Sequence, residues 1–198
     1  VVKNNTFFFI CNEMTHEVMT LQEPDYVPSE VVDNRPYDED ITTRYEIDGV
    51  HMILNTPSKA SHYDSNMSAM LLLADWFDYL REEGVYDNTR IILVSDHGTS
   101  GGQFKELKVD GKFDAQAAAC LLMVKDFNAT GFTTSEEFMT NADAPLLAMA
   151  GLIEDPVNPF TGKPLTDDEK YAHDQEFLAC KTAMPQFRDG YTYPDGEW

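Results

Sequence analysis

Basic residues are scarce in this chain. Its 198 residues include 14 lysines and arginines against 35 aspartates and glutamates, which gives a formal net charge of -21 at pH 7. Nucleic-acid binding needs a basic surface that neutralises phosphates, so we expect no nucleic-acid partner. The same deficit argues against direct contact between this chain and an anionic membrane surface.

Cysteine is rare as well. The three cysteines, Cys11, Cys120 and Cys180, lie far apart and form no CxxC pair. This spacing argues against a zinc-thiolate site, and the odd number argues against a disulfide framework. The sequence also lacks a signal peptide and a run of 18 apolar residues. We therefore expect neither a targeting segment nor a membrane-spanning segment in this chain.

Enough apolar residues remain for a folded core. Hydrophobic residues make up 42% of the chain and aromatic residues 12%. These values favour a globular domain over disorder. The length suits one domain with a tail, and prolines interrupt the sequence repeatedly after residue 153. We expect one domain over residues 1–153 and an irregular tail over residues 154–198.

Two short apolar runs, residues 6–11 and 91–94, predict buried strands. Neither run alternates with polar residues, which is typical of strands covered on both faces in a parallel sheet. Residues 62–83 predict a helix with an apolar stripe, an N-cap at Ser61 and a stop at Gly84. A further strand is expected near residues 120–124. The predicted fold class is α/β, with a mainly parallel sheet flanked by helices.

Polar residues follow both apolar runs. Asp96 and His97 come directly after residues 91–94, and His16 lies shortly after residues 6–11. The carboxyl ends of parallel strands open into the crevice where ligands bind. Since carboxylate and imidazole ligate divalent transition metals, Asp96 and His97 are candidate metal ligands. The alternative is that Asp96 caps the following turn and His97 is an incidental surface residue.

Three weaker candidates have ordinary alternatives. His62, next to the helix start, either points into the same crevice and contacts substrate or makes a common helix-terminal contact. Lys125, at a strand end, either meets an anionic substrate or forms a surface pair with Asp126. The acidic, proline-rich residues 21–48 form either a lid or a solvated connection.

The order of these features resembles a known family. After the predicted helix, residues 84–98 (GVYDNTRIILVSDHG) resemble the sulfatase branch of the alkaline phosphatase superfamily. Residues 12–17 (NEMTHE) resemble the histidine-bearing strand end of lipoteichoic acid synthases and phosphoethanolamine transferases. Residues 138–145 (FMTNADAP) resemble a late helix start of sulfatases. The resemblance covers most of residues 6–153 and does not extend into the tail.

The resemblance implies a fold and a set of roles. Residues 1–153 would be the C-terminal portion of an alkaline-phosphatase-like catalytic domain, incomplete in this chain. Asp96 and His97 match the family's metal-binding pair, for a divalent ion that could be Mn, Mg, Ca or Zn. His16 matches the catalytic histidine that contacts the transferred phosphoryl or sulfuryl group or protonates the leaving oxygen.

The family's nucleophile has no counterpart among these residues. No Cys/Ser-x-Pro-x-Arg motif is present, and the resemblance places the nucleophile and an acidic metal ligand upstream of Val1. Two ligands cannot close a metal site, since three or four are usual. We therefore expect the chain to need a missing N-terminal half of the same domain and to be inactive alone.

The implied function is metal-dependent hydrolysis or transfer of sulfate or phosphate esters, including lipid-linked ones. Phosphatases and phosphodiesterases remain alternatives within the enzyme class, because they also use Asp-His-Gly. A non-catalytic module that keeps the fold and binds a ligand or partner is the alternative from another class. If the full protein carries a membrane anchor, we expect this domain on the extracellular or periplasmic side.

Overall fold

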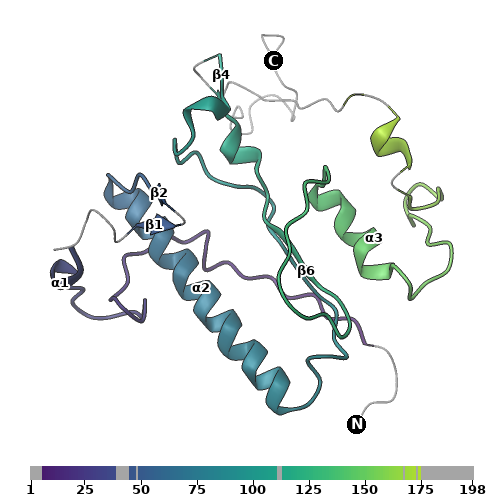
Figure 1. The fold of residues 1–198 in the computed structure, drawn as a ribbon, viewed down its shortest axis with the longest axis horizontal. Helices are drawn as coiled ribbons and strands as arrows, with labels where there is room; N and C mark the ends of the chain where they lie inside the picture. The colour runs from purple at the N-terminus through teal and green to yellow at the C-terminus, as the bar shows by residue number, and fades with distance from the viewer. Residues whose placement is uncertain are drawn as a thin grey trace, which may run out of the picture. The chain divides into compact units, whose positions relative to one another are not determined.

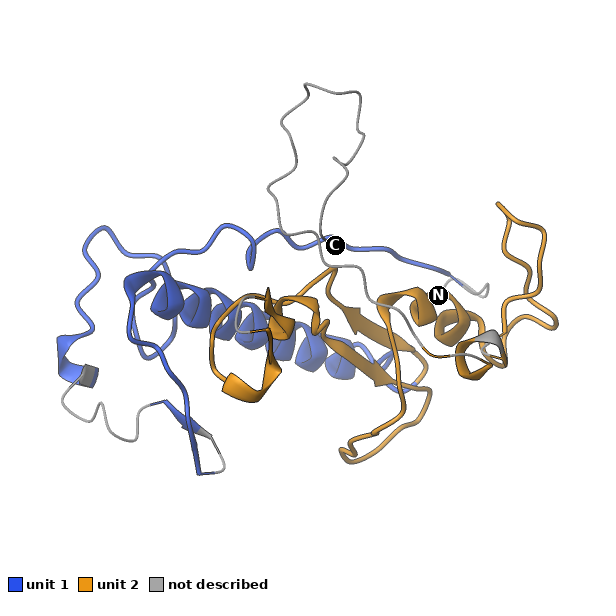
Figure 2. Ribbon diagram, turned by 90° about the horizontal axis from the view of Figure 1, so that it is seen from above, with its two compact units in different colours: residues 1–87 blue, residues 88–198 orange. Residues whose placement is uncertain are grey.

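The computed structural model of the chain describes residues 6–38, 45–47, 49–110, 113–166, 168–172 and 174. These residues form helices and small antiparallel sheets, an α/β mixture. The chain divides into two compact units, residues 1–87 and residues 88–198 (Figure 2). Within the described ranges, no helix combines the length and apolar character needed to cross a membrane.

The first unit is built on a long helix, α2, Pro57–Glu82 (Figure 1). Thr56 caps it by accepting a hydrogen bond from the backbone nitrogen of Lys59, and Pro57 fits the first turn, where an N–H is not needed. Gly84 ends the helix with a φ of 79 minus nothing less than a left-handed value, +68°. The predicted helix and its stop are confirmed. The predicted cap at Ser61 is wrong, because Thr56 and Pro57 start the helix one turn earlier.

Correction to the paragraph above: the φ of Gly84 is +68°, and the "79" in that sentence is a slip that should be deleted.

The buried face of α2 is small and polar; its members are Asp64, Ser65, Ser68 and Ala69. The backbone nitrogen of Met19 donates to Ser65 Oγ (3.0 Å), and that of Leu21 donates to Asp64 Oδ2 (3.0 Å). These side chains satisfy backbone groups of an extended segment, as a neighbouring strand would. The predicted apolar stripe is not the buried face, since Met70 within it is 39% exposed.

The acidic loop of this unit is organised by side chains over its first part. Asn34 Nδ2 donates to the backbone oxygen of Leu21 (2.9 Å), and Asn34 Oδ1 accepts from the backbone nitrogen of Glu23 (2.9 Å). A short helix, α1 (Arg35–Asp38), and a hairpin of β1 (Glu46–Ile47) and β2 (Val50–His51) follow. Residues 39–44 and 48 of the predicted loop lie outside the described residues.

The predicted strand at residues 6–11 is not formed within the described part of the chain. These residues have no strand partner, and Phe7 to Ile10 are between 71% and 82% exposed. A strand requires a neighbour that pairs with its N–H and C=O groups. The apolar pattern was recognisable from sequence, but the partner that would bury it was not.

The second unit contains the strand pair β3 (Ile91–Val94) and β6 (Leu122–Lys125). Both strands confirm predictions, although β6 begins two residues later than expected. The expected parallel arrangement is not shown: the strand pairs of the described residues are all antiparallel. A parallel pair needs a crossover back to the start of the first strand. Here the chain leaves Val94 and re-enters opposite it, at Leu122.

Short elements make up the rest of the second unit. Between β3 and β6 lie η1 (Lys105–Leu107), β4 (Lys108–Val109), β5 (Phe113–Asp114) and η2 (Ala115–Ala118). After β6 come η3 (Asn141–Asp143), α3 (Ala144–Met149) and η4 (Asp168–Tyr171). The predicted helix near residues 141–153 is thus confirmed in a shorter form. Most of the predicted tail helix, residues 167–180, lies outside the described residues.

Candidate functional site

The end of β3 is fixed by bonds that extend its pairing with β6. The backbone nitrogen of Ser95 donates to the backbone oxygen of Leu121 (3.0 Å), and the nitrogen of Leu121 donates to Ser95 Oγ (2.8 Å). Ser95 therefore uses both its backbone and its side chain to hold the neighbouring segment. The next two residues, Asp96 and His97, project from an anchored strand end.

Asp96 and His97 have the geometry of two ligands of one ion. His97 Nδ1 lies 2.7 Å from the backbone oxygen of Gly98. Because a carbonyl oxygen only accepts, Nδ1 carries the proton, and neutral His97 keeps a lone pair on Nε2. That Nε2 lies 3.6 Å from Asp96 Oδ2. Two ligand atoms on a tetrahedral ion of zinc-like bond length are about 3.4 Å apart, so this donor pair fits a divalent metal.

Both side chains are open to solvent, with 85% of Asp96 and 67% of His97 exposed. The other carboxylate oxygen of Asp96 accepts a hydrogen bond from the backbone nitrogen of His97 (2.9 Å). The backbone oxygen of Asp96 accepts from Cys120 Sγ (3.2 Å) and from Asn141 Nδ2 (3.2 Å). The backbone at this position is thus fixed while the ligand atoms stay accessible.

Gly98 follows the pair at a close approach of two backbone segments. Its nitrogen donates to the backbone oxygen of Ala117 (2.9 Å). A Cβ at this position would overlap the backbone oxygen of Gln116 and lie 2.7 Å from that of Ala119. The glycine is required here for space, not for an unusual φ.

The glycine-rich loop beyond Gly98 is held by two side chains that the sequence analysis did not single out. Asp114, which is 9% exposed, accepts from the backbone nitrogens of Gly102 (2.9 Å) and Gln116 (3.1 Å). Gln116 Oε1 accepts from the backbone nitrogen of Gln103 (2.8 Å). The available signal was Asp114 as an N-cap before a run of alanines.

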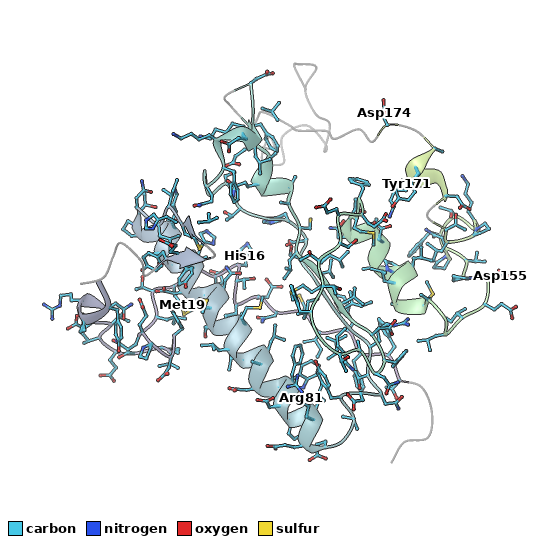
Figure 3. All side chains as sticks on the ribbon, viewed as in Figure 1. His16, Met19, Arg81, Asp155, Tyr171 and Asp174 are labelled. Atoms are coloured by element: carbon cyan, nitrogen blue, oxygen red, sulfur yellow. The ribbon has the colours of Figure 1, made fainter. Side chains whose placement is uncertain are left out.

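His16 and His62 belong to the first unit. His16, labelled in Figure 3, lies in a turn, is 70% exposed and has Nδ1 3.1 Å from Glu17 Oε1. His62 lies in α2, where its backbone oxygen accepts from Asn66 Nδ2 (2.8 Å). The structure therefore gives each histidine a local setting, while their part in a common site stays a prediction.

Lys125 is not brought to Asp96 and His97. It lies opposite Ile91, at the other end of the β3–β6 pair, and its Nζ donates to the backbone oxygen of Thr89 (2.9 Å). The antiparallel pairing explains this position, because the last residue of β6 lies beside the first residue of β3. The strand-end argument for Lys125 assumed parallel strands.

Within the described ranges, no three side chains of His, Cys, Asp or Glu gather to hold a metal ion. Asp96 and His97 are thus a pair and not a closed site. No protein-family model matches the chain, and neither a curated protein nor a solved structure matches it.

Proposed function

We propose that this chain contributes the metal-binding strand end of a metal-dependent hydrolase or transferase that acts on sulfate or phosphate esters. The observation that carries the proposal is the pairing of His97 Nε2 with Asp96 Oδ2 at 3.6 Å, with Nδ1 turned to the backbone oxygen of Gly98. This arrangement presents one nitrogen and one carboxylate oxygen to the same ion. The sequence resemblance to the sulfatase branch supplies the reaction class.

In that reaction class, a divalent ion neutralises charge on the transferred group and activates the nucleophile. Asp96 and His97 would hold the ion, and His16 would protonate the leaving oxygen or contact the transferred group. The further ligands and the nucleophile would come from an N-terminal half of the domain. Strands of that half would also complete a mainly parallel, alkaline-phosphatase-like sheet and cover the exposed residues Phe7 to Ile10.

A titration of the chain with Mn²⁺, followed by NMR of the histidine ring protons, tests the proposal. The His97 ring should broaden at a lower Mn²⁺ concentration than the ring of His51. Asp96→Asn keeps the acceptor for the His97 nitrogen but weakens the ligand. It should raise the Mn²⁺ concentration needed by about tenfold, because even a ligand's supporting partner contributes that much affinity.

Asp110→Asn is the matched control, because it removes one exposed carboxylate from the same unit and changes the net charge equally. It should leave the His97 titration unchanged. Equal broadening of all assigned histidines would contradict the proposal and favour the non-catalytic binding module. The chain alone should not hydrolyse aryl sulfates or aryl phosphates with Mn²⁺, and such turnover would contradict the need for an N-terminal half.

A further inference from the structure

The described part of the tail is anchored in the second unit. Lys170 Nζ lies 3.0 Å from Asp143 Oδ1, and only 12% and 11% of these two side chains are exposed. Tyr171, labelled in Figure 3, donates from Oη to Glu137 Oε2 (2.9 Å). An ion pair shielded from water is stronger than a solvated one. Lys170 is therefore a specific anchor, unlike the exposed Lys163 elsewhere in the tail.

Asp143 uses its second carboxylate oxygen to shape the turn before α3. Asp143 Oδ2 accepts from the backbone nitrogen of Thr140 (2.7 Å), and Thr140 Oγ1 accepts from the nitrogen of Ala142 (3.2 Å). The two bonds form a capping box around η3. Lys170 thus fixes the orientation of a carboxylate that in turn fixes the backbone on both sides of Asn141.

Asn141 links this turn to the candidate metal site. Its Nδ2 donates to the backbone oxygen of Asp96 (3.2 Å), 45 residues away in sequence. Contacts printed in one direction now join the tail, the capping box and the strand end through Lys170, Asp143 and Asn141. A chain of packed polar contacts of this kind can carry coupling between distant segments.

We propose that Lys170 is a positioning residue for the Asp96–His97 pair, acting through the Asp143 capping box and the Asn141 side chain. The proposal rests on the proposed function only for the purpose of the positioning, since the contacts themselves need no metal. It assigns a role to the tail, which the sequence resemblance does not reach.

The metal-free test is the ¹⁵N chemical shift of the His97 amide, which shares a peptide group with the Asp96 carbonyl. Asn141→Ala defines the shift when the bond to that carbonyl is lost. Lys170→Met should move the His97 resonance toward the Asn141→Ala position, Lys170→Arg should restore it, and Lys163→Met should leave it unchanged. Adding Lys170→Met to Asn141→Ala should produce no further movement.

The proposal is overturned if Lys170→Met leaves the His97 resonance at its original position, or if it moves that resonance equally in the Asn141→Ala background. Should Lys170→Met disorder α3, Lys170→Gln serves as the milder variant, since it keeps a donor toward Asp143.

The metal arm separates this proposal from the proposed function. Lys170→Met should raise the Mn²⁺ concentration that broadens the His97 ring by about fivefold, the lower range of coupling between sites. If Mn²⁺ does not select His97 in the unmodified chain, the proposed function fails. The metal-free shift still decides whether Lys170 positions the strand end.

Discussion

Gly98→Ala should open the loop after β3 and abolish selective metal binding at Asp96 and His97. The added Cβ would meet backbone oxygens of Gln116 and Ala119, and no side-chain rotation relieves such a contact. The loop must move, which breaks the bond from the Gly98 nitrogen to Ala117 (2.9 Å). We expect a local loss of about 3 kcal/mol, comparable with severe overpacking.

Hydrogen exchange measures this loss residue by residue. A loss of this size corresponds to roughly a hundredfold faster exchange of the amides that the loop closure protects. Gly101→Ala is the matched control in the same loop, because its Cβ would lie 3.9 Å from the side chain of Gln116. Similar exchange rates in the two variants would contradict the packing argument for Gly98.

Arg90→Met should destabilise the second unit strongly. Arg90 Nη1 donates to the backbone oxygens of Leu147 (2.9 Å) and Ala150 (2.7 Å) at the end of α3, and Nε donates to Asp126 Oδ1 (2.9 Å). Only 12% of the arginine side chain is exposed. We expect a loss of about 3 kcal/mol, mostly from the carbonyl groups left without a charged donor. The half-exposed Asp126 contributes less.

Exchange of the β3 amides measures this effect, and the pKa of Asp126 provides a second readout. The side-chain hydrogen bond from Arg90 lowers the pKa of Asp126, so the pKa should rise toward its ordinary value in Arg90→Met. Arg81→Met removes a solvent-exposed arginine paired with Asp78 and should cost less than about 1 kcal/mol. Equal effects of the two substitutions would show that Arg90 is not an anchor.

The sequence predicted elements whose signals are local. The apolar run of β3 and the stop of α2 at Gly84 depend on neighbouring residues, and both were found where expected. The start of α2 was missed because Thr56-Pro57 competed with the equally plausible cap at Ser61. The Asp96–His97 pair was recognised for the same reason, since both ligands lie side by side in the chain.

Contacts between distant residues could not be predicted in this way. The antiparallel pairing of β3 with β6 depends on how residues 95–121 close on themselves, and no short motif encodes that closure. Asp114 and Asn141 are ordinary polar residues in sequence, and only the fold brings them to Gly102 and Asp96. Lys125 was misplaced because its proposed role assumed a parallel sheet.

The central claim is that Asp96 and His97 hold one divalent ion, and an anomalous difference map from crystals soaked in Zn²⁺ tests it most directly. The account predicts a single strong peak within bonding distance, about 2.1 Å, of both His97 Nε2 and Asp96 Oδ2. A peak bound elsewhere, with none between these two atoms, would contradict it.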